Sequence, residues 1–282
     1  MDLLTTPAAL RSQCRQWRKH GERIALVPTM GFLHDGHMSL IDHARQRADR
    51  LVVSVFVNPT QFGPNEDLDR YPRDLPRDVR LAEAHGADAV FAPEPGAMYQ
   101  PDHATWVEVP EMAKLLCGAS RPGHFRGVCT VVLKLLNLVQ PDLAVFGQKD
   151  WQQLAILKRM ARDLDLDAEL VGMPIFREAD GLAMSSRNVY LTPEERAKVP
   201  AIRQGLLLVQ ERVLAGERDA TALGLLFEKH LAEKLPEART DYASFVHPES
   251  ISPVARINAA TLFAVAVFIG KVRLIDNILL EV

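Results

Sequence analysis

The sequence has few cysteines and no long apolar segment. Its 282 residues include three cysteines, Cys14, Cys117 and Cys129, which are widely spaced and form no Cys-x-x-Cys pair. We interpret them as reduced, buried thiols of a cytoplasmic protein, with a catalytic thiol as the alternative. The longest apolar run, TLFAVAVFIG, is too short to span a lipid bilayer, so we expect no membrane partner.

The sequence also lacks a concentration of charge. Its net charge is -3, with neither a basic arm nor an acidic tail, so we expect no nucleic-acid partner. The first residues, MDLLTTPAALRSQ, carry an early acid and no apolar core, so we expect no secretory signal. A hydrophobic share of 48% and a charged share of 24% are typical of a soluble globular protein.

Short apolar runs alternate with helical patterns through the first two thirds of the chain. The run LVVSVFVN is apolar throughout, as expected for a strand covered on both faces of a parallel sheet. The alternation predicts an α/β domain over residues 1–176, built on a Rossmann-like, doubly wound parallel sheet. Strands are expected at 23–29, 51–58, 87–93, 143–147 and 168–174, and helices at 39–48, 74–86, 127–141 and 150–165.

The order of elements changes after residue 176. Thr192 is a candidate helix N-cap, with Pro193 in the first helical position and Glu195 three residues after the cap. A further helix is expected at about 219–234, followed by short strands in DYASFVHP, LFAVAVFIG and VRLIDNILLEV. We therefore predict a smaller C-terminal α+β lid domain, residues 177–282, with an antiparallel sheet.

Two histidines follow the first predicted strand, in the stretch PTMGFLHDGH (28–37). Ligands of open parallel sheets bind where strands end and helices begin, and a helix N-terminus offers free N–H groups to phosphate. If a helix begins near Asp35, then His34 and His37 lie on one side of it and present two imidazoles to a ligand. Zinc is an alternative, but this spacing brings no cysteine or glutamate into register, and we assign no metal ligand. A pair of surface histidines without a function is the other alternative.

Amide side chains follow the second predicted strand. Asn58, Gln61 and Phe62 lie just after it, at the edge where such a sheet binds ligands. An amide and an aromatic ring at this edge can hold a small polar acid. The alternative is an Asn-Pro turn followed by a polar loop.

The stretch FGQKDWQQL (146–154) closes another strand and opens another helix. Gly147 lets the backbone approach a ligand closely, and Lys149 can place a point charge on a phosphate. Asp150 suits a helix start, with Gln153 one turn further on. The alternative for Lys149 is a solvated surface lysine.

The stretch READGLAMSSRNVYL (177–191) lies where the first predicted domain gives way to the second. Ser185, Ser186 and Arg187 offer two hydroxyls and a guanidinium, which match phosphate oxygens. PTMGFLHDGH resembles the HxGH signature of the nucleotidylyltransferase superfamily, to which class I aminoacyl-tRNA synthetases also belong. The Ser-Ser-Arg turn resembles the mobile KMSKS loop of that superfamily in position. The resemblance implies ATP binding and attack at the α-phosphorus, with the imidazoles as donors to the phosphate oxygens.

Together with RPGHFRGVCTVVLKLLN (121–137), these stretches resemble the pantoate–β-alanine ligase (pantothenate synthetase) family. The motifs occur in the family's order and spacing over nearly the whole chain, to the C-terminal DYASFVHPESISPVARINAATLFAVAVFIGKVRLIDN. Leu136 and His247 differ from the usual family residues, and both lie outside the motif cores.

The resemblance implies a nucleotide site and its catalytic groups. His37 would be the proton donor, with His34 beside it and Lys149 as a third catalytic residue. The loop that contains Arg187 would close over the phosphates. The implied ATP-binding positions are Met30, Gly31, Phe32, Leu33, His34, Asp35, Gly36, His37, Gly147, Gln148, Lys149, Asp150, Phe176, Met184, Ser185, Ser186 and Arg187.

The resemblance also implies the second site and the reaction. Gln61 and Gln153 would hold pantoate together with Asn58 and Phe62, and Gln61 would also reach β-alanine. Pantoate would attack ATP to give pantoyl adenylate and pyrophosphate, and β-alanine would then release pantothenate and AMP. The family is cytoplasmic, uses Mg²⁺ with ATP and is usually a homodimer.

Three other functions share parts of this pattern. A nucleotidylyltransferase that keeps AMP on its product would carry the same histidine pair. A tRNA ligase is less favoured, because the chain lacks the excess of basic residues expected of a polynucleotide-binding protein. A nucleotide-sensing protein without turnover is the alternative from outside the enzymes.

Overall fold

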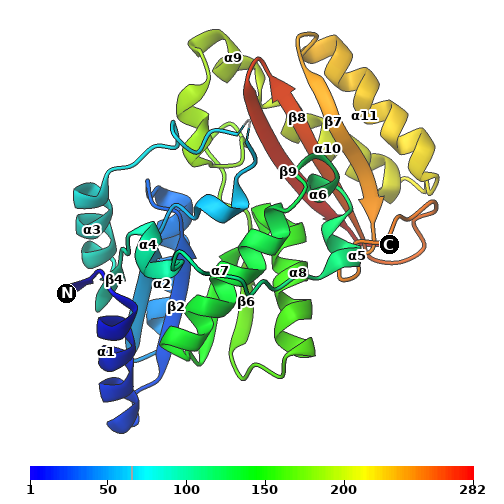
Figure 1. Cartoon of the computed structure of the whole chain (residues 1–282). Coiled ribbons are helices and arrows are strands. Elements are labelled where there is room, and N and C mark those ends of the chain that lie inside the picture. Colours follow the sequence, from blue (N-terminus) through cyan, green and yellow to red (C-terminus); the bar gives the residue numbers. More distant parts are fainter. Residues whose placement is uncertain (65) are drawn as a thin grey trace.

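The computed structural model describes residues 1–64 and 66–282 and contains two sheets (Figure 1). The larger sheet has six strands in the order β1-β4-β3-β2-β5-β6, and every paired neighbour is parallel. Its strands are β1 (Asp2–Leu4), β2 (Ile24–Thr29), β3 (Arg50–Val55), β4 (Ala89–Phe91), β5 (Leu143–Gly147) and β6 (Glu169–Met173). The predicted parallel sheet is therefore confirmed, with β3 and β2 at its centre.

Helices cover both faces of this sheet, which is why its inner strands are mostly apolar. One face packs against α1 (Pro7–Lys19), α7 (His124–Val139) and α8 (Trp151–Asp163) in one apolar core. The other face packs against α2 (Asp35–Arg47) and α3 (Leu75–Ala84) in a second core. This is the doubly wound arrangement that the alternating pattern predicts.

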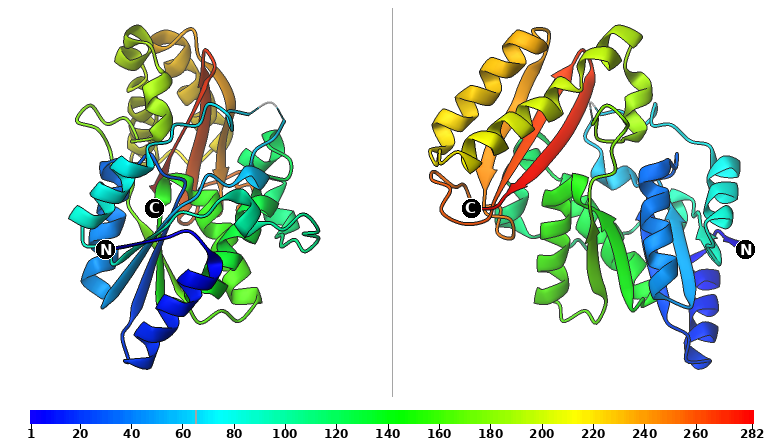
Figure 2. Two further views of the ribbon diagram at one scale, coloured as in Figure 1. Left: turned by 60° about the vertical axis from the view of Figure 1, so that its left-hand side comes forward. Right: turned by 180° about the vertical axis from the view of Figure 1, so that it is seen from behind.

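The smaller sheet is antiparallel, as predicted, and joins β7 (Arg239–Val246), β8 (Thr261–Ile269) and β9 (Val272–Leu280) in that order. Alternate residues of β8 face two different cores. Phe263 and Val265 pack with α10 (Ala201–Leu214) and α11 (Ala220–Lys234), whereas Leu262 and Ala264 join the core that contains α7 and α8. The smaller sheet thus lies between its own helices and the first part of the chain, as Figure 2 shows from two sides.

The boundaries differ from the predictions where a short or polar segment carries little periodicity. The first strand and helix, β1 and α1, were not predicted, because β1 has three residues and α1 exposes a largely polar face. The helix predicted at 127–141 begins earlier, at His124, because Gly123 turns the chain with a φ of 83°. The helix capped by Thr192 is α9 (Pro193–Lys198), which ends before Pro200 and is followed by α10.

Short turns complete the part of the chain that the structure describes. They are η1 (Pro59–Gln61), α4 (Pro95–Met98), α5 (Pro110–Ala113), α6 (Cys117–Ser120), η2 (Gln148–Asp150) and η3 (Ser186–Tyr190). The three cysteines are free, and all three are buried, as predicted. Across the described residues, none of the helices has both the length and the apolar content needed to cross a lipid bilayer.

Candidate active site

A cavity of about 230 Å³ opens at the carboxyl ends of the inner strands. It lies where β2, β3 and β5 give way to α2, η1 and η2, which is the edge at which open parallel sheets bind ligands. Its lining includes these predicted site residues: Met30, His34, Gly36, His37, Asn58, Gln61, Gly147, Lys149, Asp150, Gln153, Phe176, Met184, Ser185, Ser186 and Arg187. The fold therefore brings together strand ends that lie far apart in the sequence.

A larger cavity of about 730 Å³ adjoins the first and lies against strand β9. The two cavities share seven lining residues and meet there: Arg121, His124, Lys149, Asp150, Gln153, Ser185 and Arg187. Among the described residues, the lining of the larger cavity includes neither histidine of the HxGH stretch. The histidine pair therefore lines the smaller cavity, and the larger cavity lies beside it.

His34 and His37 stand at the first turn of α2, as predicted. His34 is the N-cap of the helix and His37 is its third residue, and their ring centroids lie 4.0 Å apart. The main-chain N–H of His34 donates to Nδ1 of His37 at 3.3 Å. The Nδ1 atom of His34 is buried and has no hydrogen-bond partner within the described chain.

The glycines around this pair make the close packing possible. A Cβ atom on Gly36 would lie 3.0 Å from the imidazole of His34, so a larger residue would displace that ring. Gly31 has a φ of 82°, and a Cβ there would lie 2.9 Å from the carboxylate of Asp78. The glycines of PTMGFLHDGH therefore leave room for the histidine and for the turn before it.

Both histidines are neutral at neutral pH. Burial and, less strongly, the Lys149 ammonium lower the pKa of His34 to about 4. Burial, followed by His34 and Lys149, lowers the pKa of His37 well below its usual value. Because Nδ1 of His37 accepts a hydrogen bond, its single proton resides on Nε2. His37 is therefore a neutral N–H donor in the cavity wall.

The predicted phosphate-binding groups line the same cavity as the histidines. Nζ of Lys149 lies 3.6 Å from the carboxylate of Asp150, which is half exposed. Ser185 caps the turn η3, where its hydroxyl accepts from the N–H of Arg187 at 3.3 Å. The hydroxyl of Ser186 donates to the carbonyl of Phe32 at 3.3 Å, so this loop touches the turn that precedes the histidines.

Arg187 is held by a carboxylate that the sequence did not indicate. Its Nε and Nη2 atoms each lie 2.8 Å from an oxygen of Asp67, and its guanidinium lies 5.4 Å from the ring of Tyr71. Burial disfavours the charge of Asp67, yet the ion pair with Arg187 holds the pKa of that carboxyl below its usual value. Two of the three guanidinium nitrogens are thus occupied.

Within the predicted acid site, the side chain of Asn58 is fully hydrogen-bonded by the protein. Nδ2 of Asn58 donates to Oε1 of Gln61 at 3.1 Å and to the carbonyl of Gly127 at 3.2 Å. Oδ1 of Asn58 accepts from the hydroxyls of Tyr99 at 2.9 Å and Thr60 at 3.0 Å. The side chain of Asn58 therefore has its full set of protein partners.

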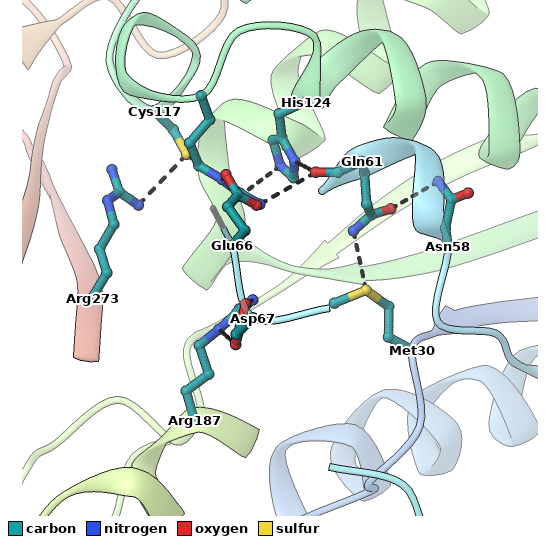
Figure 3. Close-up of polar contacts among 10 residues, drawn as sticks. Met30, Asn58, Gln61, Glu66, Asp67, Cys117, His124, Arg187 and Arg273 are labelled. Atoms are coloured by element: carbon teal, nitrogen blue, oxygen red, sulfur yellow. Dashed lines mark hydrogen bonds and ion pairs between the residues drawn. The ribbon is translucent and has the colours of Figure 1, made fainter. Parts of the chain in front are cut away.

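Gln61 receives its orientation from Asn58. Because a carbonyl only accepts, the bond to Gly127 identifies Nδ2 of Asn58 as a donor, and its second hydrogen then points to Oε1 of Gln61. Nε2 of Gln61 is left beside Sδ of Met30, 3.1 Å away in the cavity wall, and this is a weak acceptor (Figure 3). Gln61 thus presents a donor to the cavity.

An apolar wall completes the cavity on the side of α7. The lining residues there are Val128, Val131, Val132 and Leu135, with Phe56 and Phe146 from the ends of the sheet. The sequence did not indicate this wall, because the apolar residues of α7 follow the same helical period as core residues. The site therefore combines amide donors with a hydrocarbon surface, which suits a branched organic acid.

Some predicted positions lie outside the lining of the smaller cavity: Gly31, Phe32, Leu33, Asp35, Gln148 and Phe62. Leu33 is fully buried in the core under α2, and Asp35 is exposed at the start of that helix. The ring of Phe62 packs edge-on against Tyr71, with centroids 6.0 Å apart. The roles predicted for these positions stay predictions.

Several residues that shape the site were missed. Asp78 is buried in α3, and its carboxylate accepts from the N–H groups of Phe32 and Leu33, each at 2.7 Å. It thereby holds the turn in which Phe32 has a φ of 49°. The cavity is also lined by Ser54, Tyr71, Arg121 and His124. Only the stretch RPGHFRG gave a signal for the last two, and no role was assigned to them.

Among the described residues, no group of three or more histidine, cysteine or acidic side chains is arranged to hold a metal ion. Asp150 is the carboxylate that lines the smaller cavity in the described chain. One carboxylate together with substrate phosphates is a common environment for Mg²⁺. The residues present therefore fit a metal ion that arrives with a nucleotide.

Known proteins with similar sequences cover the same length. A curated pantothenate synthetase from Nitratidesulfovibrio vulgaris (strain Miyazaki F) is 59% identical over 280 residues, which is 99% of this chain and 99% of that protein. A pantothenate synthetase from Desulfovibrio desulfuricans is 60% identical over 281 residues, which is 100% of each chain. Both relatives thus align with the whole of the fold described above.

Solved structures agree with the sequences. The crystal structure of pantothenate synthetase from Thermus thermophilus superposes with a TM-score of 0.93 at 46% identity and covers 99% of each chain. The pantoate–β-alanine ligase from Francisella tularensis, complexed with β-γ ATP and β-alanine, gives a TM-score of 0.80 at 32% identity. That match covers 99% of this chain and 97% of the other.

The sequence profile described as Pantoate-beta-alanine ligase matches residues 2–279. This range contains nearly all of both sheets and every residue that lines the smaller cavity. Because the profile and the relatives cover the chain from end to end, this chain belongs to the pantoate–β-alanine ligase family.

Proposed function

We propose that the protein condenses (R)-pantoate with β-alanine at the expense of ATP and releases pantothenate, AMP and pyrophosphate. The observation that carries the proposal is the cavity in which a neutral histidine pair, amide donors and an apolar wall converge. The relatives named pantothenate synthetase support it, as does the Francisella structure that holds β-γ ATP and β-alanine. The reaction supplies pantothenate, the precursor of coenzyme A.

The first step activates a carboxylate. Pantoate attacks the α-phosphorus of ATP, which forms pantoyl adenylate and expels pyrophosphate. Negative charge grows on the phosphate oxygens, and the Nε2–H of His37 is a fixed donor for that charge. His34 and Lys149 act beside it, since both line the same cavity. The histidines enter this step neutral, so they donate hydrogen bonds without bringing a charge of their own.

The acid substrate occupies the inner part of the cavity. Gln61 donates from Nε2 to pantoate, and Gln153 faces it from α8. The geminal methyl groups of pantoate pack on Val128, Val131 and Leu135 of α7. Asn58 acts here through Gln61, because its own hydrogen-bonding groups are occupied.

The nucleotide occupies the outer part. Gly147 has open space where a side chain would stand, so the backbone there can approach ATP closely. Lys149, Ser185 and Arg187 surround the polyphosphate, and the side chain of Phe176 begins beside Gly36 near the histidines. Asp150 would be the side chain that holds Mg²⁺ brought by ATP, and the ion would there neutralise phosphate charge.

The second step joins the amine. The amine of β-alanine attacks the acyl carbon of the adenylate and releases AMP, a far better leaving group than hydroxide. The larger cavity supplies an approach for β-alanine, because it meets the smaller one at Lys149 and Gln153. A closed site then protects the adenylate from water.

The cellular setting and the assembly belong to the same proposal. The enzyme works in the cytoplasm, where its three free thiols stay reduced. It forms a homodimer through its larger domain. A Rossmann-like unit of residues 1–176 binds nucleotide and pantoate, and the unit of residues 177–282 acts as the lid.

Isotope exchange tests the proposal most directly. Labelled pyrophosphate should enter ATP when pantoate is present, and β-alanine should not be required. Pantothenate and AMP should then appear together once β-alanine is added. Retention of AMP on the product would identify a nucleotidylyltransferase, and ATP binding without turnover would identify a nucleotide sensor. Exchange that needs β-alanine alone would overturn the order of steps.

A further inference from the structure

The main-chain carbonyl of Gln61 has hydrogen-bond partners other than Asn58, which orients its side chain. Nδ1 of His124 lies 2.8 Å from the carbonyl oxygen of Gln61 (Figure 3). Nη2 of Arg121 lies 3.3 Å from the same atom. His124 starts α7, and Arg121 lies in the loop just before it. Two donors from one segment therefore converge on the residue proposed to hold pantoate.

The protonation state of His124 follows from its partners. Nη1 of Arg121 lies 3.1 Å from Nε2 of His124, and a guanidinium only donates. Nε2 must therefore accept, and the single proton of the neutral ring resides on Nδ1, where it donates to Gln61. Burial and then Arg121 lower the pKa of His124 to about 4, so this arrangement holds at neutral pH.

Arg121 is anchored by a carboxylate and is not free to bind an anion. Its Nε atom lies 2.7 Å from Oε1 of Glu66, and its Nη2 atom lies 2.5 Å from Oε2. The remaining nitrogen, Nη1, donates to His124 and also lies 3.9 Å from Sγ of Cys117. Every guanidinium nitrogen thus has a protein partner, and Glu66 balances the charge beside the cavity.

The first turn of α7 also packs directly on the turn that contains Gln61. A Cβ atom on Gly127 would lie 2.4 Å from the carbonyl of Thr60 and 2.7 Å from the main-chain nitrogen of Gln61. The carbonyl of Gly127 in turn accepts from Asn58, which orients the amide of Gln61. One helix turn therefore fixes both the place and the direction of this amide.

We propose that Arg121 and His124 are positioning residues for the acid substrate, because they fix the main chain of Gln61 and so aim its amide donor into the cavity. This inference rests on the proposed function, in which Gln61 holds pantoate. Neither residue reacts. Their effect is expected mainly at the pantoate subsite, since a shift of the donor by about 1 Å is enough to weaken binding of a positioned substrate.

Two substitutions of His124 separate the bond to Gln61 from the bond to Arg121. The side-chain nitrogen of asparagine can replace Nδ1 of histidine, so His124→Asn keeps a donor for Gln61. His124→Ala removes both bonds. We expect His124→Ala to raise the KM for pantoate about tenfold, the upper range for one hydrogen bond, and His124→Asn to stay within about threefold of the wild type. The KM for ATP should change by less than about twofold in both variants.

Arg121→Lys gives an independent measurement at the other positioning residue. Lysine keeps the charge but cannot serve Glu66, His124 and Gln61 together, because it lacks the fork of the guanidinium. We expect a selective rise in the KM for pantoate here as well. Ser120→Ala is the matched control, because the hydroxyl of Ser120 bonds to Asp241 and does not touch Gln61.

A double-mutant cycle distinguishes positioning from a merely structural role. If His124 acts through the amide of Gln61, then adding His124→Ala to Gln61→Ala should raise the KM for pantoate little beyond the single Gln61 variant. Additive effects would overturn the inference, as would equal losses for ATP and pantoate. A wild-type protein without pantoate-dependent exchange would instead overturn the proposed function, so the two failures are distinguishable. Thermal unfolding of each variant identifies any loss that comes from misfolding alone.

Discussion

The main-chain N–H of His34 donates to Nδ1 of His37 across 3.3 Å, and this bond determines which nitrogen of His37 carries the proton. Burial and the neighbouring Lys149 keep both rings neutral, as their lowered pKa values indicate. His37 therefore reaches the cavity as an Nε2–H donor. The helix N-terminus thus supplies more than a dipole, because its capping geometry selects the tautomer.

His37 should tolerate glutamine better than asparagine. The glutamine nitrogen can replace Nε2 of histidine, whereas the asparagine nitrogen corresponds to Nδ1. We expect His37→Ala and His37→Asn to lower kcat for adenylation by about 10²–10³-fold, the scale for loss of one transition-state donor. His37→Gln should recover a large part of this activity. Single-turnover formation of pantoyl adenylate measures the effect, and the Kd for ATP should change much less.

Equal losses of ATP affinity and turnover would show that His37 is a ground-state contact. Equal activities of the glutamine and asparagine variants would contradict the assigned tautomer. The first conclusion compares ATP affinity with turnover, and the second compares two variants in the turnover assay.

Asn58 should matter for pantoate even though it makes no contact of its own. In Asn58→Asp the side chain keeps its shape but loses both N–H donors to Gln61 and Gly127. Because a carboxylate only accepts hydrogen bonds, the amide of Gln61 should rotate so that its nitrogen faces residue 58 and its oxygen faces the cavity. We expect the KM for pantoate to rise at least tenfold, because an unpaired buried polar group costs about 1–3 kcal/mol.

Thr60→Val is the matched comparison for Asn58. It removes one of the two donors to Oδ1 of Asn58 and leaves the bond to Tyr99 in place. We expect a change in the KM for pantoate of less than about threefold. If the Asp variant of Asn58 binds pantoate normally, then Asn58 does not orient Gln61. Thermal unfolding is measured alongside, since a buried carboxylate also destabilises the fold.

Acid should destabilise the fold through His124. This ring is nearly buried, and its pKa falls from the usual 6.5 to about 4, first through burial and then through Arg121. Between these values the unfolded chain binds a proton that the folded chain does not, so the free energy of unfolding decreases as the pH falls. One such group contributes at most about 1.4 kcal/mol per pH unit.

Urea unfolding at about pH 7 and about pH 5 measures this dependence. His124→Asn removes the titrating ring, so its stability should fall less between the two pH values than that of the wild type. His34 and His37 have lowered pKa values as well and leave part of the dependence in place. An identical dependence in wild type and variant would show that folding does not lower the pKa of His124.

The periodic parts of the fold were predictable from the sequence, and the reason is local. β2 and β5 are mostly apolar because helices cover both faces of the sheet, so their consecutive residues carry the signal. The capping box of Thr192 and Glu195 lies within four residues and was correctly identified. β1 was missed because three residues carry no period, and its pairing with β4 joins distant parts of the chain.

The sequence predicted the site residues that follow each single strand, but not the contacts between residues of different segments. His34 and His37 lie three residues apart, so their proximity follows from the helix that contains them. The contact between His124 and the carbonyl of Gln61 joins positions 63 residues apart, and no local pattern encodes it. Asp78 likewise supports the turn at Phe32 from another helix. Such partners become visible only when the fold places them together.

Arg187 provides the last prediction, because its observed partner differs from its proposed ligand. Its Nε and Nη2 atoms hold Asp67, which leaves Nη1 for a phosphate. If Arg187 binds the polyphosphate as it becomes pyrophosphate, then Arg187→Ala should lower adenylation by about 10²–10³-fold. The reaction of preformed pantoyl adenylate with β-alanine should be affected much less, since no pyrophosphate needs to be held in that step.

Asp67→Asn separates phosphate binding from the structural ion pair. This variant keeps a hydrogen-bonding partner for Arg187 but removes the charge that competes with phosphate. We therefore expect it to retain most of the adenylation activity, whereas Arg187→Ala loses it. Rapid-quench measurement of each half-reaction, with ATP or with preformed adenylate, gives both numbers. If both variants lose both half-reactions equally, the pair of Asp67 and Arg187 is a structural clamp, and the assignment of Arg187 to the phosphates is wrong.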